Sequence, residues 1–168
     1  ERVTEFDQSW VTTGKTKDRE RNIITSLNLD PDLQYEHNLK LQAKYKSMEQ
    51  DVMFEKIECD DADFLLVAYG SSARICQKVV EMARSRGKKV GLLRPQTLFP
   101  FPSVELARMA RRVKGMMAVE LSAGQMVEDV KLAVNGRIPV SHYGMVGGKI
   151  HSPDDVLNEL EKKYIGGY

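Results

Sequence analysis

The chain has 168 residues, with 25 lysines and arginines against 24 aspartates and glutamates, so its formal net charge is +1. This balance indicates neither a nucleic-acid surface nor a strong attraction for acidic ligands. The length suits one domain with an extension and is sufficient to bury a hydrophobic core. No apolar run is long enough to span a membrane. We therefore expect a cytoplasmic protein whose partners include neither nucleic acid nor a membrane.

The N-terminal part is predicted to be an extended segment followed by a long helix. Residues 1–31 show no sustained period and start at Glu1 without a methionine, so we expect a link from a missing preceding domain. Asp30-Pro31 is a helix start, because aspartate caps free N–H groups and proline in the first turn loses no hydrogen bond. Residues 32–62 then hold an amphipathic helix to about Glu58 and a connection. The apolar stripe of this helix consists of Leu41, Tyr45, Met48 and Val52.

Two interpretations of this helix stay open. The favoured one is a helix that packs on its own domain through the apolar stripe. The alternative is a connecting arm that docks against a partner subunit.

Residues 63–168 alternate between apolar runs of strand length and helical periodicities. The predicted strands are 64–70, 88–94, 116–121 and 139–143, and the predicted helices are 72–86, 103–113, 124–134 and 153–164. Strands separated by single helices pair in parallel through right-handed crossovers. The sequence thus predicts an α/β fold with a doubly wound, mostly parallel sheet.

An apolar loop stiffened by proline follows the second of these strands. Arg94-Pro95 ends the strand, because proline has no N–H to donate and restricts the residue before it. The loop that follows is Leu98-Phe99-Pro100-Phe101-Pro102. Such a loop is costly to leave in water, so we expect it to pack under its own fold or against another subunit.

The turns that lead from strands into helices supply candidate binding residues. Free N–H groups and the helix dipole make these turns potential anion sites. Capping is the favoured explanation, since Ser122 with Gln125 has the spacing of a capping box and Ser152 precedes a proline. The guanidinium of Arg94 suits phosphate or carboxylate, or a salt bridge across a domain interface. The candidate anion-binding residues are Ser71, Ser72, Arg94, Gly124 and Gln125.

Other polar residues suggest structural roles. Glu120, near the end of the third strand, is expected to orient a cation, pair with Arg94 or anchor a neighbouring chain. His142 lies in an apolar strand and is expected to be a satisfied core residue. Cys76 is predicted to be buried and Cys59 exposed, and two cysteines are too few for an iron–sulfur cluster. No Walker loop, dinucleotide fingerprint or nucleophile elbow is present, so we assign no catalytic residue and no metal ligand.

Five motifs in a fixed order give the chain a family resemblance. They are Trp10-Val-Thr-Thr-Gly14, Asn38-Leu-Lys-Leu-Gln42 with Lys44-Tyr45, Val67-Ala-Tyr-Gly-Ser-Ser72, residues 87–102, and Gly144-Met-Val-Gly-Gly148 with Pro153. Through them the chain resembles the C-terminal, transketolase C-terminal-like domain of the α subunit of 2-oxoacid:ferredoxin oxidoreductases. The basic run Lys15-Thr-Lys-Asp-Arg19 replaces an acidic, histidine-containing motif of some relatives, which favours the 2-ketoisovalerate branch over the pyruvate and 2-oxoglutarate branches.

The resemblance implies an enzyme that oxidatively decarboxylates a 2-oxoacid, joins the acyl group to coenzyme A and passes electrons through iron–sulfur clusters to ferredoxin. In that family the β subunit holds most of the thiamine diphosphate and magnesium site, and the clusters lie in other subunits or domains. The implied partners are β and γ- or δ-type subunits and ferredoxin. This domain is expected to serve subunit assembly and active-site access, with the candidate residues forming an anion or coenzyme A edge. Alone it is expected to be inactive and to bind none of these cofactors.

Two other classes of protein are alternatives. One is the equivalent domain of another thiamine diphosphate enzyme, such as a transketolase or a branched-chain dehydrogenase β subunit, which the loop from Arg94 to Pro102 argues against. The other is a non-enzymatic module of flavodoxin-like shape whose glycine-serine turns hold an anion or a nucleotide. That hypothesis predicts ligand binding by the isolated chain.

Overall fold

The computed structural model describes residues 12, 14, 17–18 and 20–165. The chain divides into two units, residues 1–44 and residues 45–168. Within the predicted segment 1–31, residues 1–11, 13, 15–16 and 19, and with them Trp10, lie outside the described residues. Residues 20–28 form neither helix nor strand, in keeping with the irregular segment expected there.

Helix α1 (Pro31–Met48) begins where the sequence predicts. The side chain of Asp30 accepts hydrogen bonds from the backbone N–H groups of Asp32 (2.9 Å) and Leu33 (3.3 Å), which is the expected cap. No residue of α1 is buried.

The predicted extension of this helix to Glu58 is wrong. A short 3₁₀ turn, η2 (Glu49–Asp51), follows α1, and strand β1 (Phe54–Ile57) comes next. This strand pairs antiparallel with β3 (Val90–Pro95), and the C=O of Met53 accepts hydrogen bonds from the N–H groups of Gln96 and Thr97. The apolar residue at position 52 thus continued the helical stripe by coincidence, because the ladder with β3 decides the local structure.

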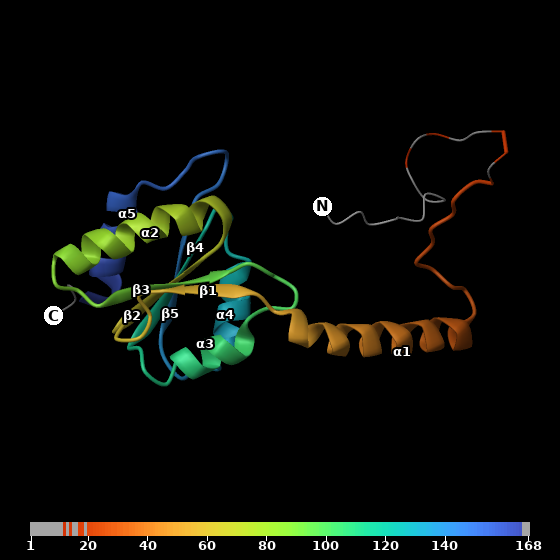
Figure 1. The fold of residues 1–168 in the computed structure, drawn as a ribbon, viewed down its shortest axis with the longest axis horizontal. Coiled ribbons are helices and arrows are strands. Elements are labelled where there is room, and N and C mark those ends of the chain that lie inside the picture. Colours follow the sequence, from red (N-terminus) through yellow and green to blue (C-terminus); the bar gives the residue numbers. More distant parts are fainter. Residues whose placement is uncertain (1–11, 13, 15–16, 19, 166–168) are drawn as a thin grey trace, which may run out of the picture. The chain divides into compact units, whose positions relative to one another are not determined.

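The central sheet has the order β1-β3-β2-β4-β5 (Figure 1). Strands β2 (Phe64–Ala68), β4 (Gly115–Glu120) and β5 (Val140–Gly144) complete it with β3, and all pairs among these four strands are parallel. The predicted strands and their parallel pairing are confirmed. The unpredicted β1 adds one antiparallel edge strand.

Helices cover both faces of the sheet, as a doubly wound fold requires (Figure 1). Helices α2 (Gly70–Ser85) and α5 (Pro153–Leu160) pack on one face, and α3 (Ser103–Met109) and α4 (Met126–Val134) pack on the other. A π-helical turn, η3 (Glu161–Ile165), continues α5. Alternate residues of β2 serve the two cores, since Leu65 and Val67 face α3 and α4 whereas Leu66 and Ala68 face α2 and α5.

Both cysteines are buried and free. The expectation for Cys76 is confirmed, and burial raises the pKa of its thiol to about 12. The expectation that Cys59 is exposed is wrong. Its Sγ lies 3.2 Å from the C=O of Leu92, and burial raises the pKa of this thiol as well, so neither cysteine is a reactive thiolate.

The strand order fixes where a ligand would be expected. From β2 the chain crosses to β3 on one side, and the next strand, β4, lies on the other side of β2. The carboxyl ends of β2 and β4 therefore flank the topological switch point, which is the usual ligand crevice of open α/β sheets. The turns at Gly70 and at 121–125 lie at this edge.

Core and exposed leucines should differ sharply in their effect on stability. We expect Leu92→Ala, at a side chain with no exposed surface, to lower the free energy of unfolding by about 2–5 kcal/mol. The matched change Leu33→Ala, at a side chain of α1 that is 62% exposed, should change it by less than about 0.5 kcal/mol. Urea unfolding followed by circular dichroism checks both values. Comparable losses in the two variants would contradict the division into a packed core and an exposed helix.

Candidate functional site

The carboxylate of Glu120, the last residue of β4, caps helix α4. Its side chain is fully buried. Oε2 accepts hydrogen bonds from the backbone N–H groups of Gln125 (3.1 Å) and Met126 (3.0 Å), and Oε1 accepts one from Val127 (3.1 Å). The hydroxyl of Ser122 donates a further bond of 2.7 Å to Oε2. A buried negative charge thus lies at the positive end of the helix dipole.

These bonds keep Glu120 ionised. Burial alone raises the pKa of the carboxyl group, but the bonds from Ser122 and from the three backbone N–H groups outweigh burial and hold the pKa below its usual range. The pairing of Glu120 with Arg94 that the sequence suggested does not occur. The first turn of α4 is the partner instead.

Two histidines lie beside Glu120, one against its carboxylate and one against its backbone carbonyl. Nε2 of His142 lies 3.4 Å from Oε1 of Glu120, which is within ion-pairing distance for a protonated imidazole although it is outside hydrogen-bond geometry. The ring of His142 is half-buried and its Nε2 makes no hydrogen bond, so the expectation of a satisfied core residue is wrong. Nε2 of the buried His151 lies 3.1 Å from the C=O of Glu120, and burial lowers the pKa of this imidazole.

Gly144 lets β5 approach the turn after β4. A Cβ at this position would overlap the C=O of Ser122 and lie 2.5 Å from Cε1 of His142. The glycine of the predicted Gly144–Gly148 loop is therefore needed for close backbone approach.

Gly124 and Gln125 belong to this closed cluster. The N–H of Gln125 donates to Glu120, and the N–H of Gly124 donates to Oγ of Ser122 at 3.3 Å. The predicted capping box is wrong, because α4 begins at Met126 and the acceptor for its first turn is Glu120. The N–H groups that would have bound an external anion are engaged inside the chain.

Arg94 is likewise engaged within the domain. Its guanidinium lies 3.2 Å from the carboxylate of Glu55, the residue opposite Arg94 in the β1–β3 ladder. This pair joins two strands of one sheet, so the domain-interface salt bridge suggested by the sequence is replaced by a cross-strand pair.

Ser71 and Ser72 open α2 at the switch point. Gly70 has φ +56°, which turns the chain from β2 into the helix, and the N-cap residue Tyr69 provides no side-chain cap. Ser72 is buried and Ser71 is exposed. Among the five predicted binding residues, these two alone are not drawn into the Glu120 cluster or the Arg94 pair. The predicted Ser152 cap of α5 is confirmed by its bond from the N–H of Asp155.

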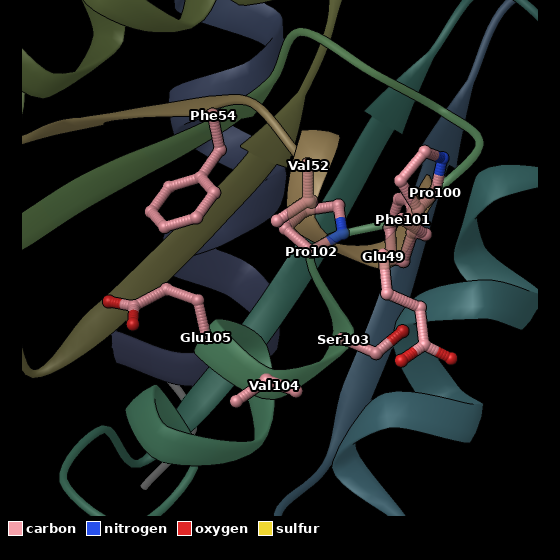
Figure 2. A pocket seen from close by; sticks show the side chains of 9 residues that line it. All are labelled: Glu49, Val52, Phe54, Pro100, Phe101, Pro102, Ser103, Val104 and Glu105. Atoms are coloured by element: carbon pink, nitrogen blue, oxygen red, sulfur yellow. The ribbon is translucent and has the colours of Figure 1, made fainter. Parts of the chain in front are cut away.

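A groove on the surface of residues 45–165 is the second candidate site (Figure 2). It has a volume of about 450 Å³ and lies between the Val52–Phe54 segment and the loop that enters α3. Its lining is Glu49, Val52, Phe54, Pro100, Phe101, Pro102, Ser103, Val104 and Glu105. The sequence could not reveal this groove, because η2 and β1 form one of its walls and neither was predicted.

The apolar loop divides between the interior and the surface. Phe101 packs against the core beneath α3 and α4, whereas Phe99 is 62% exposed and meets Tyr45 edge to face at 5.4 Å. Packing under the fold of the chain itself is confirmed for Phe101, and a contact of Phe99 with another subunit stays a prediction.

The described residues do not fit a metal or an iron–sulfur cluster. In this part of the chain, no group of three or more histidine, cysteine or acidic side chains is arranged so that it could hold a metal ion. Its two thiols are buried and stay protonated. Among the helices described, none has the length and apolar character needed to cross a membrane.

Comparison with known proteins identifies the family. The model of the pyruvate:ferredoxin oxidoreductase core domain II matches residues 62–156. The chain belongs to this family. The predicted resemblance to 2-oxoacid:ferredoxin oxidoreductases is confirmed.

Two curated relatives from Methanothermobacter marburgensis illustrate the relationship. The ketoisovalerate oxidoreductase subunit VorB is 40% identical over 157 residues, which are 93% of this chain and 44% of that protein. The 2-oxoglutarate synthase subunit KorA is 36% identical over 101 residues, or 60% of this chain and 27% of that protein. The chain thus spans less than half the length of these relatives.

Solved structures agree on the fold. A 2-oxoglutarate:ferredoxin oxidoreductase from Magnetococcus marinus, with 2-oxoglutarate, coenzyme A and succinyl-CoA bound, aligns with a TM-score of 0.58 and 17% identity over 80% of this chain and 24% of that chain. A split-gene transketolase aligns with a TM-score of 0.56 and 17% identity, over 66% of this chain and 40% of that chain. The core domain II fold is therefore transketolase-like, as predicted.

Neutralising the buried carboxylate should destabilise the domain in a pH-dependent way. We expect Glu120→Gln to lower the free energy of unfolding by about 2–3 kcal/mol at pH 7, because an amide NH₂ would face backbone N–H donors. The pKa of Glu120 is lowered in the folded state, so its stabilisation is complete above the unfolded value of about 4.3 and is lost as the pH falls through the folded-state pKa. The difference in the free energy of unfolding between wild type and variant should therefore become smaller below about pH 4. Urea unfolding at several pH values measures it.

The exposed Glu128 on the same helix gives a matched control. Among the described residues its carboxylate pairs with Lys131 alone, so Glu128→Gln should change stability by less than about 0.5 kcal/mol. Equal effects of the two substitutions, or a gap for Glu120→Gln that does not depend on pH, would contradict the capping role.

Proposed function

We propose that the chain is part of the α subunit of a 2-oxoacid:ferredoxin oxidoreductase that acts on 2-ketoisovalerate. The enzyme would oxidatively decarboxylate the oxoacid, join the acyl group to coenzyme A and reduce ferredoxin in the cytoplasm. The observation that supports this proposal best is the 40% identity to a ketoisovalerate oxidoreductase subunit over 93% of the chain. The similarity to 2-oxoglutarate synthase subunits covers less of the chain at lower identity.

We place the cofactors outside this domain. The donor sets of the described residues do not fit magnesium or an iron–sulfur cluster, and the N–H groups at the start of α4 are occupied by Glu120. Thiamine diphosphate with its magnesium would then lie with a β-type subunit, and the clusters with γ- or δ-type subunits or other domains. An edge for coenzyme A or another anion on this domain would rest on Ser71 and Ser72, where α2 has no side-chain cap.

The role proposed for the domain itself is subunit assembly and the shaping of active-site access. Its relatives are named as subunits, which implies that they work with other chains. The surface supports this role, because apolar side chains of the Leu98–Phe101 loop remain exposed beside a groove. The alternative of a free-standing nucleotide module has less support, since three of the five candidate residues are engaged in bonds within the chain.

Substrate choice is tested on the whole enzyme, purified without oxygen together with its companion subunits. We expect reduction of a viologen dye that depends on coenzyme A and on a 2-oxoacid, with the highest kcat/KM for 2-ketoisovalerate among 2-ketoisovalerate, pyruvate and 2-oxoglutarate. Iron and thiamine diphosphate should be recovered with the complex. Faster turnover of 2-oxoglutarate would overturn the substrate assignment, and a chain purified alone without oxoacid activity would overturn the enzyme assignment.

A further inference from the structure

The groove between the Val52–Phe54 segment and α3 has the shape of a receptor for a side chain. Phe54, Phe101 and the prolines at 100 and 102 give it an apolar wall, and the exposed Val104 also lines it (Figure 2). A volume of about 450 Å³ admits a large aliphatic or aromatic side chain with its flanking backbone. Apolar side chains that face water in this way carry a cost in free energy.

The surface around the groove is apolar over several elements. Val104 is 86% exposed and Phe99 is 62% exposed. Tyr45 touches Phe99, and the backbone of Met53 is bonded to Gln96 and Thr97, so these side chains belong to one neighbourhood. The exposed apolar residues there are Tyr45, Met53, Leu98, Phe99 and Val104. Clustered exposure of this extent marks an interaction surface rather than scattered surface residues.

Charge distinguishes the two sides of the groove. Glu105, on one side, is neutralised by Lys56 at 3.3 Å and Arg108 at 2.6 Å. Glu49 lies on the other side, near Ser103 (Figure 2), and neither it nor Asp51 has an ion-pair partner among the described residues. The Glu49 side therefore suits a cation from another molecule.

We infer that this groove docks another subunit of the same enzyme, which inserts an aliphatic or aromatic side chain beside Phe54 and Phe101 and sets a lysine or arginine against Glu49. The inference rests on the proposed function, since that function supplies the additional subunits. A second copy of this chain fits less well. A two-fold contact joins the same patch on both copies and would bring the carboxylates of Glu49 and Asp51 from each copy into one interface.

Exposed positions allow the docking surface to be altered without disturbing the fold. Val104→Asp puts a charge on the exposed part of the groove lining, and Glu49→Lys reverses the charge on its acidic side. Leu132→Asp is a matched control, because Leu132 is 80% exposed on α4, and Glu128→Lys is the matched charge reversal. All four variants should keep the wild-type circular dichroism unfolding curve, which separates lost docking from lost folding.

Assembly is measured by native mass spectrometry of the enzyme, with all subunits coexpressed and purified without oxygen. We expect Val104→Asp and Glu49→Lys each to lower the fraction of chain found in the complex by about tenfold, as for the loss of an interface hot spot. Both controls should assemble as the wild type does. Wild-type assembly of Val104→Asp and Glu49→Lys would overturn the inference.

A photo-crosslinker identifies the occupant. With p-benzoylphenylalanine in place of Ser103 in the assembled enzyme, the crosslinked peptide should come from another subunit and contain an aliphatic or aromatic residue close to a lysine or arginine. A crosslink to a second copy, a crosslink within the same polypeptide, or no crosslink would each overturn the inference. Oxoacid-dependent dye reduction by the wild-type complex is recorded separately. Its absence would refute the proposed function while the assembly measurements still decide whether the groove is a docking surface.

Discussion

The buried carboxylate of Glu120 is the interaction on which the carboxyl edge of the sheet depends. It ends β4, takes three backbone N–H groups at the start of α4 and lies beside His142 on β5. A buried charge is costly unless its hydrogen-bonding capacity is met, and here the turn between β4 and α4 meets it. Position 144 must then be a glycine, because the C=O of Ser122 lies where a Cβ would be. One side chain thus fixes the geometry of two strands, a turn and a helix.

This arrangement occupies N–H groups at the place where α/β folds usually bind ligands. At the switch point, the N–H groups of α4 that would meet an external phosphate already hold an internal anion. The second strong feature of the domain is an apolar, partly acidic groove on its surface, which suits protein contact. Both features agree with the proposal that this domain serves assembly of an enzyme and does not carry its chemistry.

The regular α/β part could be predicted from the sequence because apolar periodicity and caps such as Ser152 determine it locally. Strand β1 could not, since its conformation depends on pairing with β3, about forty residues away, and Val52 happened to extend a helical stripe. The role of Glu120 was also hidden. The carboxylate and the N–H groups that it caps are separated by a loop, so the nearer Ser122–Gln125 pair resembled the cap. The ion pair that engages Arg94, a predicted anion-binding residue, was hidden as well, because its partner Glu55 lies on the unpredicted strand.

The most direct test of this account is a calorimetric titration of the chain with thiamine diphosphate in the presence of magnesium. The account predicts no saturable binding, because the described residues offer no metal site and the start of α4 at the switch point is filled by Glu120. Tight binding at one site per chain would contradict it. That result would show that the domain holds the cofactor itself rather than serving the subunits around it.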